Sequence, residues 1–338
     1  MRRTKYMTLL AGATIAGLAL AGCAKGGSAA EGGAGEGVLT GAGIDGNTIK
    51  LGLLSDYSGP FSPLATEVLE GAKAYWTEKN AAGGVCDAYT VELVVRDHAF
   101  NVSQAVSAYQ EIAQDVLAFQ DFSGAAPLAA VLPDLEADSR LTLANSATKM
   151  LIDSPMTLIP AAHIGTDTAL STNWLLKNGK IAEGDAIAIV FQETDYGEQA
   201  KEGLEKFAEE HGMTVLPYQV KPTDADLTPH VNDALGKDAA AVVAAVSPGQ
   251  TASIATVLQS AGASIPIAGV YTSYVPALLD TPAAKYLKKH FTQTSYITTF
   301  EDGAGAELYE KLSAALPDMT LTSNATQGYT AAVQLDGL

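Results

Sequence analysis

The sequence predicts an α/β protein with two doubly wound lobes, each a parallel sheet covered by helices on both faces. Short, almost wholly apolar runs recur along the chain, and the segments between them carry apolar residues at helical spacing. Strands that are apolar throughout are typical of parallel sheets buried on both faces. The alternation occurs in two separate sets, so we expect two lobes.

The N-terminus has the pattern of an export signal. A basic start is followed by an apolar run from Met7 to Ala21, too short to span a membrane, and then by Gly22 and Cys23. Small residues directly before a cysteine resemble the bacterial lipoprotein box. We therefore expect residues 1–22 to be a lipoprotein signal peptide. We also expect a lipid on Cys23 to anchor the protein to the outer face of the cytoplasmic membrane, in an extracellular or periplasmic location.

Residues 23–47 read as the lipidated cysteine and a flexible linker. From Ala24 onward this segment is mostly Gly, Ala, Ser and Glu, and it buries too little apolar surface to offset the entropy of ordering it. Gly41, Gly43 and Gly46 spell G-x-G-x-x-G, but a dinucleotide loop follows a strand and this one precedes the first strand. We interpret it as linker composition and expect no cofactor.

The two sets of apolar runs give the expected strands, and the periodic segments give the expected helices. Strands are expected at 49–54, 91–95, 116–119 and 141–144 in the first lobe, and at 186–191, 214–218, 241–246 and 265–269 in the second. Helices are expected at 64–80, 103–115, 197–211, 249–261, 303–315 and 324–335.

The chain is expected to cross between the lobes at residues 161–167 and again in a strand-like run at 291–299. Lobe one then comprises 48–160 plus 294–338, and lobe two comprises 161–293. The last predicted helix has no strand after it, so we expect a C-terminal segment to be missing. Cys86 is the only cysteine after Cys23, and its disulfide partner is expected in that missing segment.

Ligands of open parallel sheets bind beyond the carboxyl ends of the strands. Among the loops expected there, Ser123-Gly124-Ala125 and the stretch from Asn145 to Thr148 end at or near helix starts, where free N–H groups favour a carboxylate. Helix capping is the simpler role for any single Ser or Asn. The full set of candidate loops is 55–62, 97–101, 121–127, 145–148, 192–196, 247–250 and 271–274.

Composition and motifs argue against several classes of function. A net charge of −18 argues against binding to nucleic acid. The five histidines are scattered, so no metal site is expected. No nucleophile elbow or phosphate loop stands in a suitable context. Asp97 is expected to tie down its loop and His98 to be solvated, so we expect no enzyme.

Several motifs together resemble the extracellular solute-binding proteins of the leucine/isoleucine/valine-binding type. They are IKLGLLSDYSGP at 49–60, EGA at 70–72, NAAGGV at 80–85, Ala147-Thr148 and Tyr196-Gly197. The resemblance covers roughly residues 48–338. It implies a periplasmic binding protein of type I, with two Rossmann-like lobes, a multi-strand hinge and delivery of a small solute to the permease subunits of an ABC importer. We expect a monomer.

The resemblance also implies roles for individual residues. The ligand carboxylate would be held by Ser123-Gly124-Ala125 and Ser146-Ala147-Thr148, although Ser123 requires a local shift of the alignment, and Tyr196 would close over the ligand. Tyr57 and Tyr271 suit stacking on a planar or apolar ligand. Ser247 and Thr272, in two further candidate loops, complete the predicted site.

One departure from the family pattern leaves the ligand open. Tyr271, followed by Thr272, stands where amino-acid binders carry an acid, and burying an ammonium without a countercharge costs several kcal/mol. An amino-acid-like solute, an aromatic or branched carboxylate, an amide and a urea-type solute all remain open. A ligand-sensing receptor domain is a second hypothesis, and a degenerate α/β hydrolase is a third.

Overall fold

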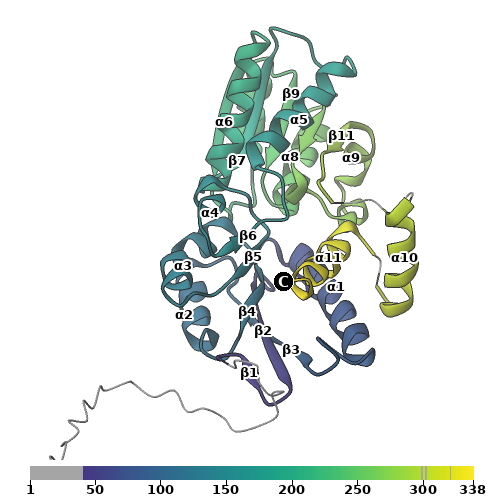
Figure 1. Ribbon diagram of the computed structural model, residues 1–338. Helices are drawn as coiled ribbons and strands as arrows, with labels where there is room; N and C mark the ends of the chain where they lie inside the picture. The colour runs from purple at the N-terminus through teal and green to yellow at the C-terminus, as the bar shows by residue number, and fades with distance from the viewer. Residues whose placement is uncertain (1–40, 298–299, 301–302, 320) are drawn as a thin grey trace, which may run out of the picture. The chain divides into compact units, whose positions relative to one another are not determined.

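The computed structural model describes residues 41–297, 300, 303–319 and 321–338. The predicted signal peptide, Cys23 and residues 24–40 of the predicted linker lie outside these residues. Within the described residues the strands form two sheets (Figure 1). None of the helices described is both long and apolar enough to cross a membrane.

The first sheet is built from the N-terminal part of the chain. Its central strand β2 lies between β3 and β4, and β5 and β6 extend the sheet beyond β4, with all these pairs parallel. The short strand β1 pairs with β2 in the antiparallel sense. The strands are β1 (Ile44–Asp45), β2 (Thr48–Ser55), β3 (Thr90–Asp97), β4 (Ala118–Phe122), β5 (Thr142–Ala144) and β6 (Thr157–Leu158).

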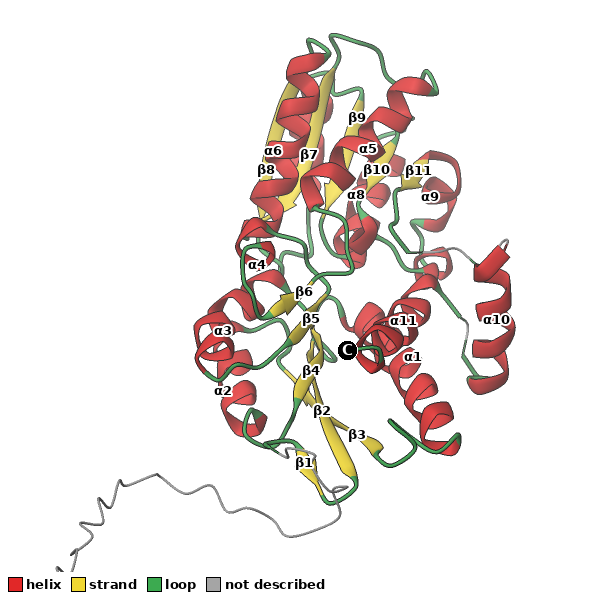
Figure 2. Ribbon diagram, viewed as in Figure 1, coloured by secondary structure: helices red, strands yellow, loops and turns green. Residues whose placement is uncertain are grey.

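Helices cover both faces of this sheet (Figure 2). On one face, Trp76 of α1 and Ala332 of α11 pack on Leu51. On the other face, α2 and α3 pack on Phe119 and Phe122. The helices of this half are α1 (Ser62–Ala81), α2 (Val102–Ile112), α3 (Ala125–Ala137), α4 (Lys149–Ile152), α10 (Gly303–Ala315) and α11 (Ser323–Asp336).

The second sheet repeats the strand order of the first. Its order β8-β7-β9-β10-β11 matches β3-β2-β4-β5-β6, and its pairs are parallel. Each element of one sheet therefore has an equivalent in the other, with β4 and α3 matching β9 and α8. The strands are β7 (Ala186–Gln192), β8 (Thr214–Val220), β9 (Ala241–Ala245), β10 (Ile267–Gly269) and β11 (Phe291–Gln293).

The core of the second half also has two layers. Helices α5 and α6 cover one face of the sheet around Phe191 and Val243, and α7, α8 and α9 cover the other around Val242. The helices are α5 (Ile164–Lys177), α6 (Asp195–Glu210), α7 (Thr228–Gly236), α8 (Pro248–Ser260) and α9 (Ala284–His290), with the short 3₁₀ turns η1 (Tyr271–Ser273) and η2 (Pro276–Asp280).

After β11 the chain returns to the first half, where α11 lies against α1. Two glycines permit this close approach. A Cβ on Gly71 would lie 1.9 Å from the carbonyl oxygen of Ala325, and a Cβ on Gly328 would lie 1.8 Å from that of Val68. A larger residue at either position would force the two helices apart.

The structure differs from the sequence prediction at both ends of lobe two. Helix α5 begins at Ile164, inside the stretch expected to be only a crossing. The strand expected from residue 291 to 299 ends at Gln293. The hydroxyl of the next residue, Thr294, donates to the Asp167 carboxylate. The expected linker also extends too far, since Ile44–Asp45 already pairs with β2. Cys86 is an exposed free cysteine in the described part of the chain.

His98 was expected to be solvated, and this expectation was wrong. Its side chain is 0% exposed. One ring nitrogen contacts the carbonyl oxygen of Ser123 at 3.1 Å, and the other accepts a hydrogen bond from the Phe100 N–H. Burial lowers the pKa of His98, which favours the neutral ring. Asp97 ties down its loop as expected, because it accepts the N–H groups of Tyr57 and Ala99.

Candidate functional site

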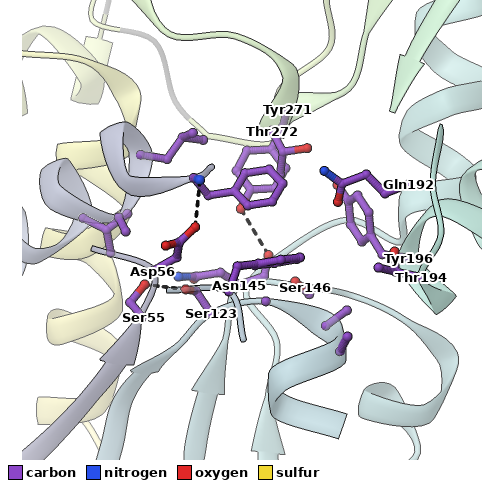
Figure 3. Close-up of a pocket in the computed structure, with 18 of the residues that line it drawn as sticks. Ser55, Asp56, Ser123, Asn145, Ser146, Gln192, Thr194, Tyr196, Tyr271 and Thr272 are labelled. Carbon is purple, nitrogen blue, oxygen red and sulfur yellow. Dashed lines mark hydrogen bonds between the residues drawn. The ribbon is translucent and has the colours of Figure 1, made fainter. Parts of the chain in front are cut away.

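A cleft with a cavity volume of about 60 Å³ lies where the carboxyl ends of strands from both sheets face each other. This is the position at which open α/β sheets bind ligands. Figure 3 shows Ser55, Asp56 and Ser123 on one side of the cleft and Gln192, Thr194 and Tyr196 on the other.

The structure brings seven of the predicted site residues together in the lining of this cleft: Ser123, Gly124, Ala125, Ser146, Tyr196, Tyr271 and Thr272. Four others lie outside the lining. Ala147 and Thr148 are buried, with Thr148 at the N-cap of α4. Ser247 is buried in the N-cap of α8, and the ring of Tyr57 packs beside Leu53.

The N-terminus of α3 is open to the cleft. Gly124 occupies the N-cap with φ +87° and offers no side chain to cap the helix. Among the described residues, the backbone N–H groups of Ala125 and Ala126 have no acceptor, and the third residue, Pro127, has no N–H to satisfy. Unpaired N–H groups and the helix dipole make such an end favourable for an anion.

Hydroxyl and amide groups form a polar floor beneath this helix end. The hydroxyls of Ser55 and Ser123 are hydrogen-bonded to each other. Asn145 donates to the carboxylate of Asp121 and accepts a hydrogen bond from Gln327 at 2.9 Å. This network joins the ends of β2, β4 and β5 to helix α11.

The acids around the cleft are engaged by their own surroundings. Asp56 accepts the N–H groups of Gly59 at 2.5 Å and Phe61 at 2.8 Å. Asp167 accepts the Tyr271 N–H at 3.0 Å and the Thr294 hydroxyl. Burial raises the pKa of both carboxyls. Each oxygen of both carboxylates therefore already accepts a hydrogen bond from the protein itself.

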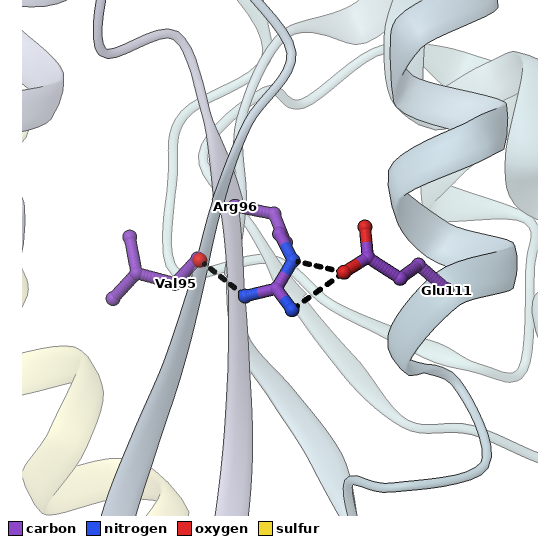
Figure 4. A network of polar contacts seen from close by, with 3 residues as sticks. All are labelled: Val95, Arg96 and Glu111. Atoms are coloured by element: carbon purple, nitrogen blue, oxygen red, sulfur yellow. Dashed lines mark hydrogen bonds and ion pairs between the residues drawn. The ribbon is translucent and has the colours of Figure 1, made fainter.

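Within the described part of the chain, no cationic side chain lines the cleft. Arg96, on β3, is bound elsewhere (Figure 4): its guanidinium donates to Glu111 of α2 at 2.7 and 3.0 Å and to the carbonyl oxygen of Val95 at 2.9 Å. Hydrogen bonds from Arg96 lower the pKa of Glu111. Among the described residues, no group of three or more His, Cys, Asp or Glu side chains could hold a metal ion.

The rest of the lobe-one wall is apolar. Phe61, Leu64, Ala65 and Val68, from the start of α1, line the cleft opposite Ala245 and Val246 at the end of β9. The stretch from Phe61 to Val68 rises by about 10 Å at the pitch of an α-helix. These side chains give the lobe-one wall an apolar surface over about that length.

The two halves already touch each other across the cleft. The Tyr271 hydroxyl donates to the carbonyl oxygen of Asn145 at 3.2 Å, and the Lys149 N–H donates to the Gln199 side chain at 3.0 Å. Leu64 of α1 packs into the apolar cluster of the second sheet. The conformation described is therefore a closed one.

Sequence reasoning missed part of the lining. Most of these residues, such as Asn145, Gln192 and Phe100, belong to loops that were already expected at the sheet edge. The exceptions lie in regular elements, where periodicity marks a residue as buried but does not say what it is buried against. The lining residues outside the predicted site are Ser55, Asp56, Phe61, Leu64, Ala65, Val68, Phe100, Ala126, Asn145, Gln192, Thr194, Ala245, Val246 and Gln327.

Comparison with known proteins identifies a family and several solved structures that share this fold. Residues 48–335 match the family model described as periplasmic binding protein. No curated protein sequence matches the chain. Among solved structures, a fatty acid ABC transporter substrate-binding protein from Thermomonospora curvata is 32% identical with a TM-score of 0.86, and the match covers 89% of this chain and 77% of that one.

Two more distant structures share the fold. A branched-chain amino acid ABC transporter protein from Thermus thermophilus, with bound valine, is 18% identical with a TM-score of 0.74 over 85% of this chain and 76% of that one. A solute-binding protein from Rhodopseudomonas palustris, in complex with p-hydroxybenzoic acid, is 18% identical with a TM-score of 0.74 over 86% and 79%.

Proposed function

This chain belongs to the periplasmic binding protein family, and we propose that it is the substrate-binding component of an ABC importer for an amphipathic monocarboxylic acid. One observation carries the choice of ligand: the uncapped start of α3 and the apolar start of α1 line the same cleft. An anionic head and an apolar body match these two walls.

In this proposal the carboxylate accepts the N–H groups of Ala125 and Ala126 and the hydroxyl proton of Ser123, three residues that line the cleft. Hydrogen bonds to an ionised acceptor contribute about 1.5–3 kcal/mol each. The apolar body lies along Phe61, Leu64 and Val68. The similarity to the fatty acid transporter protein of Thermomonospora curvata supports an aliphatic body.

An α-amino acid is a poor fit for this cleft. Its ammonium would require an accessible acid, and Asp56, the acid in the lining, already accepts two N–H groups of its own loop. Asp167 lies outside the lining and is bound by Tyr271 and Thr294. Asp121 is buried beneath Ser55 and Ser123. Tyr271 contributes a neutral hydroxyl, which already donates to Asn145. An ammonium buried here would cost several kcal/mol.

Ligand capture would work through a shift in population between open and closed lobes. The head contacts groups of the first half, whereas Gln192, Tyr196 and Thr272 come from the second half. Contacts from both halves exist only in the closed state, so a ligand favours closure by its differential affinity. The permease subunits would then recognise the closed form.

Anchoring through a lipid on Cys23 remains part of the proposal. This anchor would hold the two-lobed protein, as a monomer, at the outer face of the cytoplasmic membrane beside the permease. Mass spectrometry of the protein extracted from membranes is expected to show a diacylglycerol-modified Cys23 at the mature N-terminus. Cys23→Ser should release the protein from the membrane fraction, and an unchanged distribution would contradict anchoring.

A thermal-shift panel tests the proposed ligand class. It compares octanoate, octanamide, 2-aminooctanoate, 4-hydroxybenzoate and valine on the same purified protein. Ligand at 100 times its Kd adds about 2.7 kcal/mol to the free energy of unfolding. Octanoate is expected to give the largest shift and 2-aminooctanoate a much smaller one. The largest shift with 2-aminooctanoate or valine would contradict the proposal.

Measuring solute uptake by cells distinguishes an import function from a sensing function. Cells lacking this protein should lose uptake of the acid that binds best, and re-expression should restore it. Unchanged uptake together with binding by the purified protein would favour a sensing receptor domain.

A further inference from the structure

One ionisable group lies beneath the ligand cleft without a full set of partners. Asp121, on β4, is 3% exposed. Its Oδ1 accepts a hydrogen bond from Asn145, and its Oδ2 has no hydrogen-bond partner of ordinary geometry within the described residues. The groups directly above it, Ser55, Ser123 and Asn145, all line the cleft.

Ser55 connects this carboxyl to the proposed position of the ligand head. The Ser55 side chain lies close enough to Asp121 to favour its ionised form, and the Ser55 hydroxyl is hydrogen-bonded to the Ser123 hydroxyl. Each hydroxyl has one proton and donates it to one acceptor. In the row Asp121–Ser55–Ser123, all hydrogen bonds must therefore be donated in the same direction. The protonation state of Asp121 decides that direction.

The two directions present different faces to a ligand. When Asp121 is ionised, Ser55 donates to it and Ser123 donates to Ser55, which leaves a Ser123 lone pair toward the cleft. When Asp121 is protonated, it donates to Ser55, Ser55 donates to Ser123, and the Ser123 hydroxyl proton becomes available to the ligand. Only the second arrangement suits an anion.

Few other charges act on Asp121. Burial raises its pKa to about 7. Tyr57, beyond the end of β2, and Tyr271, on η1, both interact with it, but burial raises the pKa of each phenol, so both remain neutral in the physiological range. His98, between β3 and α2, is buried and contacts the Ser123 carbonyl oxygen, and its lowered pKa favours the neutral form. Asp56, directly after β2, is bound by the N–H of Gly59 in its own loop. Helix α11 contributes the neutral Gln327.

We propose that Asp121 is a specificity-determining residue that takes up one proton from solvent when the cleft binds an anionic ligand, and that this proton turns the Ser55–Ser123 chain into a donor. The inference rests on the proposed function, because it requires an anionic head near Ser123. A second negative charge buried close to an ionised Asp121 would otherwise be strongly unfavourable.

The affinity for an anion then depends on pH. The direction of this dependence follows because binding and proton uptake are coupled. Below pH 7 Asp121 already carries the proton, so binding takes up none and the affinity is constant. Above pH 7 binding requires proton uptake, and the Kd rises by about tenfold between pH 6 and pH 8. A neutral ligand with the same body does not require this proton.

Calorimetry of octanoate binding, in two buffers of different ionisation enthalpy, counts the protons. We expect about 0.9 proton taken up per octanoate at pH 8 and about 0.1 at pH 6. Octanamide is the matched neutral probe and should bind with no uptake at either pH. Asp121→Asn keeps the acceptor for Asn145 and has no ionisable group, so its octanoate affinity should be the same at pH 6 and pH 8.

The outcomes separate this inference from the proposed function. If octanoate binds wild type with equal affinity at both pH values and without proton uptake, the inference is overturned and the ligand class stands. If octanoate binds at neither pH, both are overturned. The proton count is made on wild type, so it remains decisive if Asp121→Asn does not fold.

Discussion

Helices α3 and α8 occupy equivalent positions in the two halves, but their N-termini are built in opposite ways. Helix α8 begins with a complete capping box, in which the Ser247 hydroxyl accepts the Gln250 N–H and the Gln250 side chain accepts the Ser247 N–H. Helix α3 begins with Gly124 and has no side-chain cap. Side chains of α8 cap its own first turn, whereas no side chain caps α3.

The strands that lead into these helices also differ in polarity. Strand β9 is apolar throughout, from Ala241 to Ala245. Strand β4 carries Gln120 and Asp121 in an equally buried position. In our proposal the first half holds the charged head of the ligand, and the second half closes over it with neutral groups.

Asp121→Asn tests the buried acid and has the largest expected effect. Because the pKa of Asp121 is raised from 3.8 to about 7, the carboxylate form destabilises the folded state progressively as pH rises from 4 to 7. Asp121→Asn should raise the free energy of unfolding by up to about 4 kcal/mol at pH 8. Urea unfolding at pH 8 and pH 4 measures it, and an equal effect at both pH values would contradict the account.

Ala125→Pro gives α3 the residue type that α8 already has at its first position, Pro248. Proline is tolerated there, so the fold should persist. The change removes one N–H from the proposed site, and we expect octanoate affinity to fall about 10- to 100-fold. Unchanged affinity in a variant with an unchanged circular dichroism spectrum would exclude this N–H from the site.

Gly124→Ala and Gly249→Ala form a matched pair at the two helix starts. A side chain at Gly124 is strained by its φ of +87° and meets Phe100 at 3.0 Å, whereas a Cβ on Gly249 meets nothing within 4 Å. We expect Gly124→Ala to cost about 1–3 kcal/mol of stability and to weaken octanoate binding. Gly249→Ala should change stability and octanoate binding much less. Equal effects of the two substitutions would contradict the proposed difference between the starts of α3 and α8.

Ser123→Ala and Ser247→Ala give the smallest effects and should separate binding from stability. Ser247→Ala breaks the capping box, so it should lower stability by about 1 kcal/mol and leave octanoate affinity unchanged. Ser123→Ala should weaken octanoate binding by about tenfold. The reverse pattern, with Ser247→Ala affecting affinity, would place the head on the second half.

Much of the fold follows from local patterns, and the candidate site follows only in part. The strand runs predicted both sheets, and sheet topology then named the loops that surround the cleft. Ser123 and Ser247 both stood in polar loops before a helix. The Gln three residues after Ser247 is a capping-box signal that could have separated them.

Other features of the site depend on tertiary structure. The apolar residues at Leu64 and Val68 have the spacing of any core-facing helix, and only the packing of α1 shows that part of this face lines a cleft. The sequence placed Asp121 in a loop after a strand predicted at 116–119, whereas Asp121 lies inside the fully buried strand β4. The same is true of His98, which looked like a loop residue and is fully buried.

The position of the ligand head is tested most directly by ¹H–¹⁵N NMR during a titration with octanoate. The account predicts that the amide resonances of Gly124, Ala125 and Ala126 move most, because these N–H groups receive the carboxylate. The amides of Gly249 and Gln250 should move little, because neither residue lines the cleft and the Ser247 hydroxyl already accepts the Gln250 N–H. Larger shifts at α8 than at α3 would contradict the account.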